Sequence, residues 1–220
     1  MLEKYMEEQN LVTTVLQKSL KNDKLVQAYL FSSDDIDYIY KYAKDFSKDI
    51  ISLSGLPSET LENIYKRIDK DEYTELKVVE PDGNTIKTSQ LIELQNSVST
   101  KPVEANKIIY IIKNCEKLNS SSANCILKFL EEPEDDIIAI LLTDNINMVL
   151  PTIKSRCQIL NFKNNNSNKM KNILFFVGLD ITDEDKEKFI HNSIDFLMNI
   201  EKYKINTIIK VKKLAYDVYK

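Results

Sequence analysis

Arg156 is the residue whose type and neighbours point most directly to chemistry. It stands between Ser155 and Cys157, and the chain has one other arginine, Arg67, among its 30 basic residues. The planar guanidinium fork of arginine binds carboxylates and phosphates in a bidentate way that a lysine ammonium does not reproduce. An arginine in such a lysine-rich chain therefore indicates either recognition of a phosphate group or a structural ion pair at the start of a strand.

The cysteines, the histidine and a run of acidic residues form weaker patterns. Cys115, Cys125 and Cys157 are widely spaced and include no Cys-x-x-Cys pair, so the sequence predicts neither a zinc site nor a dithiol redox site. His191 is the single histidine, without a metal-ligand companion at suitable spacing. We interpret the acidic residues within 131–136 as a solvated helix end and loop. We expect reduced, mostly buried thiols, no metal site and no cofactor.

Five short apolar runs supply the elements that must position these residues. They cover residues 28–32, 75–80, 107–113, 136–143 and 157–162, and segments with apolar residues at helical spacing lie between them. Continuous rather than alternating hydrophobicity is typical of parallel strands that are covered on both faces. The sequence predicts an α/β fold with a five-stranded parallel sheet, in which Thr88 caps one helix and a residue within 119–122 can cap the next.

The composition changes after Phe162. An Asn-rich linker covers residues 163–169, and the residues beyond it follow helical patterns. Two domains are therefore predicted: an α/β domain over residues 1–162 and a small all-helical domain over residues 163–220.

Composition and charge exclude several classes of function. The 220 residues are 43% hydrophobic, and 30 basic residues against 34 acidic ones give a net charge of −4. A free-standing nucleic-acid binder usually has a basic excess, because phosphate neutralisation dominates its affinity. The acidic start of the chain is unlike a secretory signal, and no apolar run reaches the length of a membrane span. We expect a cytoplasmic protein that does not contact a membrane.

Four sequence blocks, in order over about 130 residues, carry a family resemblance. The first block is EPDG (80–83) together with the IK (86–87), Q and L that come after it. The other three are the KP before the third strand, ANCILKFLEEP (123–133) and LPTIKSRCQ (150–158). Together with QAYLFS (27–32), they resemble the bacterial DNA polymerase III clamp-loader family. The resemblance implies an AAA+ type P-loop NTPase sheet followed by a small helical lid domain. It also implies that Arg156, in the SRC motif Ser155-Arg156-Cys157, is an arginine finger that reaches ATP bound by a neighbouring subunit.

The resemblance also locates the positions where working relatives bind nucleotide. Their glycine-rich phosphate loop follows the strand that AYLFS resembles, yet this chain continues with Ser33-Asp34-Asp35 and has no glycine before Gly55. Their D-E-A-D cluster corresponds to Lys113-Asn114-Cys115-Glu116, and the sensor position to Thr143-Asp144-Asn145. We expect a degenerate nucleotide site, because the glycines, the phosphate-binding lysine and two carboxylates are missing.

A degenerate site beside an intact SRC motif is similar to the stator-type, delta prime subunits of this family. The four-cysteine zinc module and the C-terminal collar domain of many relatives have no counterpart in this chain. We predict a non-hydrolysing subunit of the DNA polymerase III holoenzyme that is not an enzyme by itself and completes a neighbour's ATPase site in trans. Its partners would be the ATPase motor subunit, the clamp-opening subunit and, through the complex, the sliding clamp and primed DNA. The alternatives are an active, gamma/tau-like motor subunit and an interaction module used outside replication.

Overall fold

A single parallel sheet forms the centre of the described part of the chain. The computed structural model describes residues 1–163 except residue 100 and residues 133–135. The strands are β1 (Ala28–Ser32), β2 (Leu76–Val79), β3 (Ile108–Ile112), β4 (Ile137–Thr143) and β5 (Gln158–Asn161). Their order in the sheet is β2-β3-β4-β1-β5, and every neighbouring pair is parallel. The predicted α/β fold and all five predicted strands are confirmed.

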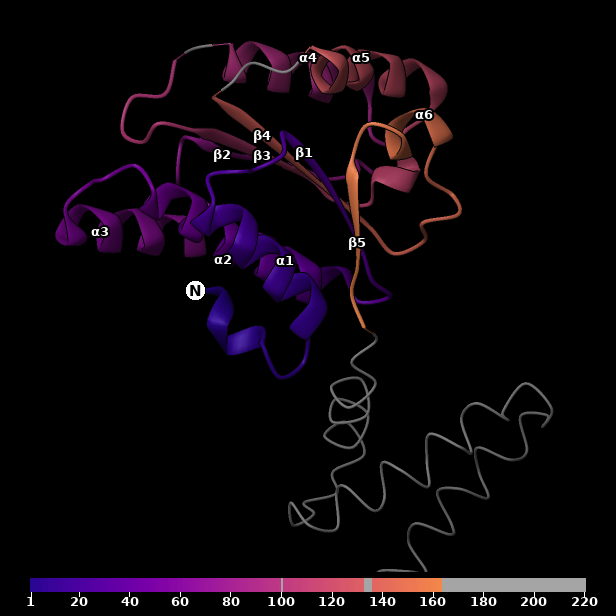
Figure 1. The fold of residues 1–220 in the computed structure, drawn as a ribbon. Coiled ribbons are helices and arrows are strands. Elements are labelled where there is room, and N and C mark those ends of the chain that lie inside the picture. Colours follow the sequence, from indigo (N-terminus) through magenta and orange to yellow (C-terminus); the bar gives the residue numbers. More distant parts are fainter. Residues whose placement is uncertain (100, 133–135, 164–220) are drawn as a thin grey trace, which may run out of the picture. The chain divides into compact units, whose positions relative to one another are not determined.

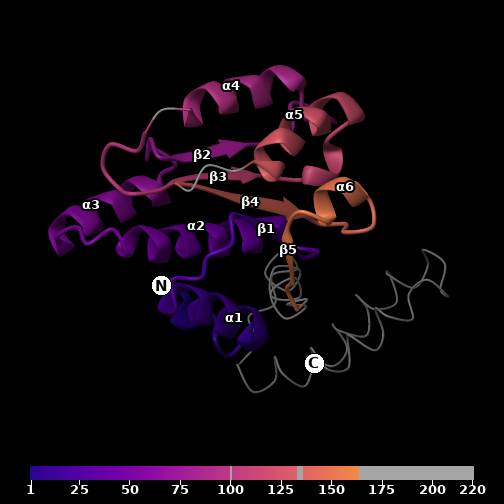
Figure 2. The ribbon, with the colours of Figure 1, turned by 45° about the horizontal axis from the view of Figure 1, so that its top comes forward.

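Helices cover both faces of this sheet (Figures 1 and 2). The chain begins with the short 3-10 helix η1 (Leu2–Tyr5), and α1 (Asn10–Lys21), α2 (Ile36–Ser52) and α3 (Ser58–Asp69) lie on the same face. The opposite face carries α4 (Thr88–Val98), η2 (Cys115–Lys117), α5 (Ser120–Glu131) and α6 (Pro151–Lys154). In α3 the two buried side chains, Ile64 and Ile68, lie one helical turn apart.

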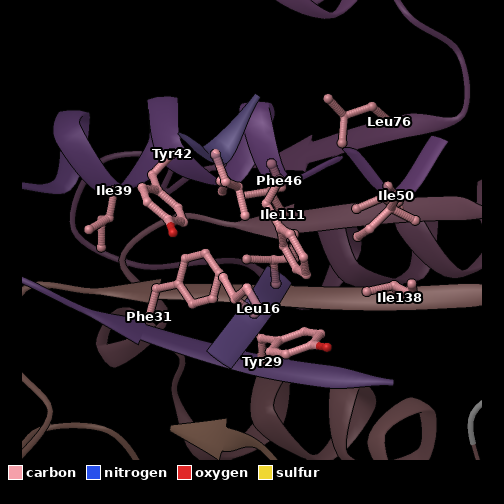
Figure 3. Packing of buried hydrophobic residues seen from close by; sticks show 14 of the residues in the cluster. Leu16, Tyr29, Phe31, Ile39, Tyr42, Phe46, Ile50, Leu76, Ile111 and Ile138 are labelled. Atoms are coloured by element: carbon pink, nitrogen blue, oxygen red, sulfur yellow. The ribbon is translucent and has the colours of Figure 1, made fainter. Parts of the chain in front are cut away.

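The two faces of each strand explain why the apolar runs are continuous. In β1, Tyr29 and Phe31 pack into the core on the α1–α2 side, whereas Ala28 and Leu30 pack into the core on the α4–α5 side. Because successive side chains of a strand point to opposite faces, both sets must be apolar when both faces are covered. Figure 3 shows the first core, in which the ring of Phe31 lies near Tyr42 of α2 and the ring of Tyr29 packs against Phe46 of the same helix.

Of the two helix N-caps expected from the sequence, the structure confirms the one of α5 and contradicts the one of α4. Asn119, the first residue of the predicted capping range 119–122, caps α5, because its side chain accepts from the Ser122 amide at 2.9 Å. The predicted cap at Thr88 is wrong by one residue. The N-cap of α4 is Lys87, whose own amide donates to Oε1 of Gln90 at 2.9 Å. The glutamine oxygen thus satisfies the amide of the N-cap residue, whereas a threonine hydroxyl at the N-cap would have accepted from an amide in the first helical turn.

The predicted domain boundary falls at the end of the described residues. The small helical domain predicted over residues 163–220 lies outside them, apart from Lys163. None of the helices in residues 1–163 is long and apolar enough to cross a membrane.

Candidate functional site

The SRC segment lies in the tight turn between α6 and β5. Pro151 begins α6, where its fixed φ suits the first helical turn, and the Arg156 amide donates to the Ile153 carbonyl at 3.1 Å. The next strand pairs with β1, with Gln158 opposite Tyr29. Arg156 therefore lies at the amino end of β5, next to the beginning of β1.

Three acceptors within the chain contact the Arg156 guanidinium. Nη1 donates to the Thr152 carbonyl at 2.8 Å and to the Ser155 hydroxyl at 3.3 Å, and Nη2 forms an ion pair with the carboxylate of Glu131 at the end of α5. The arginine side chain is 32% exposed and that of Glu131 is 47% exposed. A pair so open to water is worth about 0–1 kcal/mol, so another anion can replace the carboxylate at little cost.

An open pocket of about 270 Å³ brings the three predicted site residues together. It is lined by residues 26–28 at the start of β1, by Phe129 and Leu130 of α5, and by residues 155–158. The lining combines apolar side chains with the Arg156 guanidinium and with the polar side chains of Gln27, Ser155 and Gln158. Figure 1 shows α6 close to α5, with β5 leading away from α6.

The thiols near this pocket are not reactive at neutral pH. Burial raises the pKa of Cys157 to about 12, and burial, with a smaller contribution from the Glu116 carboxylate, raises the pKa of Cys115 well above its usual value. Both groups are therefore protonated, and a protonated thiol is neither a good nucleophile nor a metal ligand. No three potential metal ligands cluster within the described residues.

The positions matched to a nucleotide site lie at the other edge of the sheet, where the parallel strands end. A turn of three residues, Ser33 to Asp35, joins β1 to α2. Asp35 caps α2, because its Oδ1 accepts from the Tyr38 amide at 3.0 Å. The turn is held to β4, since the Ser33 amide donates to the Thr143 carbonyl at 3.1 Å. The anion-binding end of α2 is thus occupied by the chain's own carboxylate.

A cation and a hydrogen-bonded carboxylate follow β3 at the same edge. Lys113 Nζ lies 3.1 Å from Oε2 of Glu80 and 4.7 Å from the centroid of the Tyr40 ring. Glu116 Oε2 accepts from the Thr143 hydroxyl at 2.6 Å. The other oxygen of Glu116 is buried and has no hydrogen-bond partner within the described residues. The lysine therefore pairs with the acidic residue that follows β2.

The two groups of predicted residues are far apart. β1 separates them, and its five residues span about 13 Å at roughly 3.3 Å per residue. The SRC segment lies at the amino end of that strand and the Ser33–Asp35 turn at its carboxyl end. Arg156 is therefore remote from its own chain's nucleotide position.

Sequence reasoning did not identify Glu131 as the partner of Arg156. The glutamate is the first residue of the acidic run, which was interpreted as a solvated helix end, and its exposed fraction fits that description. The available signal was that both residues belong to the blocks carrying the family resemblance. Their separation of 25 residues gives no local spacing that would pair them.

Comparison with known proteins extends over most of the α/β part of the chain. A family model described as DNA polymerase III, delta subunit, matches residues 8–166. The chain is 37% identical over 154 residues to the DNA polymerase III subunit delta' of Bacillus subtilis, which covers 69% of this chain and 46% of that protein. It is 31% identical over 149 residues to the DNA polymerase III subunit tau/gamma of Haemophilus influenzae, which covers 66% of this chain and 21% of that protein. The chain thus spans less than half the length of either curated relative.

A solved structure supports the same fold. The crystal structure of a DNA polymerase III gamma-subunit-related protein from Thermotoga maritima superimposes with a TM-score of 0.55 at 20% identity, covering 86% of this chain and 57% of that one. The range that the family model matches contains both the Ser33–Asp35 turn and Arg156. The chain belongs to the DNA polymerase III delta subunit family.

Proposed function

We propose that this chain acts in DNA replication as a delta-prime-type, non-hydrolysing subunit of the bacterial clamp loader. It completes the ATPase site of a neighbouring subunit in trans through Arg156 and helps load the sliding clamp onto DNA. The 37% identity to a protein named as a delta' subunit supports this assignment. Its partners would be the motor and clamp-opening subunits, with the clamp and primed DNA contacted through the assembly.

The position of Arg156 is the observation that carries the proposal. Its guanidinium is partly exposed at the amino edge of the sheet, whereas the Ser33–Asp35 turn lies at the carboxyl edge. At that distance from its own chain's nucleotide position, Arg156 would reach a nucleotide only if another chain held it. A guanidinium beside the transferred phosphoryl group stabilises the charge that develops there and accelerates hydrolysis roughly 10³- to 10⁵-fold in known cases.

The geometry of the carboxyl edge supports the absence of hydrolysis by this chain. A phosphate-binding loop needs glycines whose amides surround the phosphates, and a three-residue turn without glycine offers no such cradle. The Asp35 carboxylate already accepts from the first turn of α2, and Lys113 is already paired with Glu80. An incoming triphosphate would have to displace the first contact, and its magnesium ion would meet the Lys113 cation where relatives have a carboxylate.

The alternative is an active motor subunit of the gamma/tau type. The 31% identity to a tau/gamma subunit favours it, as does the fold that this chain shares with a gamma-related protein. The altered turn and the lysine after β3 count against it. The third hypothesis, an interaction module used outside replication, has no specific observation in its favour.

The proposal also covers the domain organisation, the location of the protein and its need for a metal or cofactor. The α/β domain would end at residue 162 and a small helical lid domain would cover residues 163–220. The protein would work in the cytoplasm, without a metal or cofactor of its own.

The test is ATP hydrolysis by a clamp loader reconstituted with this protein. Arg156→Ala should remove the trans contribution at one site and lower DNA- and clamp-stimulated hydrolysis several-fold, because other sites keep fingers from other subunits. Arg156→Lys should be nearly as damaging, since the ammonium lacks the planar fork.

Arg67→Lys is the matched control. Arg67 is 30% exposed and forms an ion pair with Glu104, so it resembles Arg156 in type, exposure and partner but lies on α3. Its replacement should leave hydrolysis unchanged. Normal hydrolysis by both Arg156 variants, in complexes that assemble normally, would refute the proposal.

A further inference from the structure

The Arg156 guanidinium is held from two separate parts of the fold. Thr152 and Ser155 belong to the same turn as Arg156, so their hydrogen bonds fix local geometry. Glu131 comes from the end of α5, which lies 25 residues earlier in the chain. The ion pair to Glu131 is therefore the contact that sets the direction of the arginine relative to the rest of the domain.

From this arrangement we infer that Glu131 is a positioning residue for Arg156, an inference that rests on the proposed function. An unrestrained arginine side chain has many rotamers, and most of them do not point at a given external phosphate. A carboxylate fixed to another helix reduces that number before the neighbour arrives. Positioning of this kind raises the rate of the assembled site, because less side-chain freedom is lost on reaching the transition state.

The end of α5 is rigid enough to serve as the anchor. Leu130, next to Glu131, is 7% exposed and packs into the core on the α4–α5 side. Leu130 and Arg156 line the same open pocket. The carboxylate is thus attached to a buried part of the domain, while its own side chain stays in solvent.

Glu131 orients the Arg156 guanidinium and still leaves it able to bind an anion. Arginine keeps its charge when it is paired, and a guanidinium has more N–H donors than the three bonds described here use. The 47% exposure of Glu131 places the pair in water, where solvent screens the repulsion between the carboxylate and an incoming phosphate.

Glu132 provides a matched control at the adjacent position. It carries the same charge, but it is the C-cap of α5 and its backbone, with φ −126° and ψ 64°, is no longer helical. The carboxylate that forms the ion pair with Arg156 belongs to Glu131. A general effect of negative charge near the pocket would appear equally in Glu131→Gln and Glu132→Gln.

The experiment measures kcat and KM for ATP hydrolysis, stimulated by DNA and clamp, in a clamp loader reconstituted with this protein. Glu131→Gln should lower kcat about two- to fivefold, the range expected for an exposed ion pair, with KM for ATP unchanged. Glu132→Gln should change neither, and Glu131→Asp should recover part of the loss because it keeps the charge. When Arg156→Ala is already present, Glu131→Gln should have no further effect.

The outcomes separate this inference from the proposed function. If Arg156→Ala lowers kcat but Glu131→Gln leaves it unchanged or raises it, Glu131 is not a positioning residue and the function of Arg156 stands. An equal loss from Glu131→Gln with and without Arg156 would assign the glutamate a structural role and overturn the inference. If Arg156→Ala leaves hydrolysis normal, the proposed function fails and the inference fails with it.

Discussion

The buried carboxylate of Glu75 offers the sharpest test of how the fold is held together. It is 5% exposed and accepts from the amides of Val103, Glu104 and Ala105, and from the Tyr73 hydroxyl at 2.8 Å. These bonds fasten the loop that follows Lys101-Pro102, one of the sequence blocks shared with the clamp-loader family, just before β3. The perturbation is Glu75→Gln, which keeps the shape but removes the charge.

The magnitude follows from the donors that the glutamine cannot satisfy. Four donors converge on the carboxylate, and an amide has a single oxygen, while its NH₂ group would face other N–H groups. A hydrogen bond to a charged group contributes about 1.5–3 kcal/mol, and losing part of this set should cost about 3–5 kcal/mol. Single domains have about 5–15 kcal/mol of stability in total. The midpoint of thermal unfolding should fall by roughly 10 °C, at about 2–4 °C per kcal/mol for a chain of this size.

The assay is urea unfolding of the chain at pH 7, followed by circular dichroism, beside a thermal melt. Glu72→Gln is the control, because Glu72 is exposed on the same connection between α3 and β2. It should change the free energy of unfolding by less than about 0.5 kcal/mol. A loss below 1 kcal/mol for Glu75→Gln would refute the claim that this carboxylate clamps the loop.

Three further predictions concern nucleotide, acid and the end of β5. The isolated chain should bind a fluorescent ATP analogue with magnesium no tighter than roughly 1 mM, about −4 kcal/mol. Saturation at low micromolar concentration would show that the carboxyl edge still forms a nucleotide site. Burial opposes ionisation of Asp45, but Lys4, Tyr5 and Lys48 more than compensate and lower its pKa below 3.8. The stability from Asp45 is therefore complete above about pH 5 and lost as pH falls through the lowered pKa. Asp45→Asn should flatten the acid side of a plot of unfolding free energy against pH, and an unchanged slope would contradict this. Gln9→Leu should cost about 1–3 kcal/mol in urea unfolding, because the buried side-chain amide makes two hydrogen bonds of 2.9 Å with the backbone of Lys163. Unchanged stability and unchanged amide exchange at Lys163 would contradict that expectation.

The sequence by itself determined the class of the fold and the order of its strands along the chain. Apolar runs such as residues 137–143 are buried at every position, so their hydrophobicity reports burial on both faces without reference to any distant residue. The cap at Asn119 was equally local, since a side chain and an amide three residues apart decide it. The family blocks located Arg156 and the Ser33–Asp35 turn for the same reason, because each is a contiguous run of residues.

The tertiary structure decided which of these residues meet. Because all the strands are parallel, Arg156, which precedes β5, lies at the amino edge and the Ser33–Asp35 turn, which follows β1, at the carboxyl edge. The spatial order β2-β3-β4-β1-β5, which the order of strands along the chain does not fix, makes β1 and β5 neighbours. The partners of Arg156 and of the 103–105 amides are carboxylates 25 or more residues away, Glu131 and Glu75. Exposed and buried glutamates look alike in a sequence, because the burial and hydrogen bonding that distinguish them arise only when the sheet and its helices have packed.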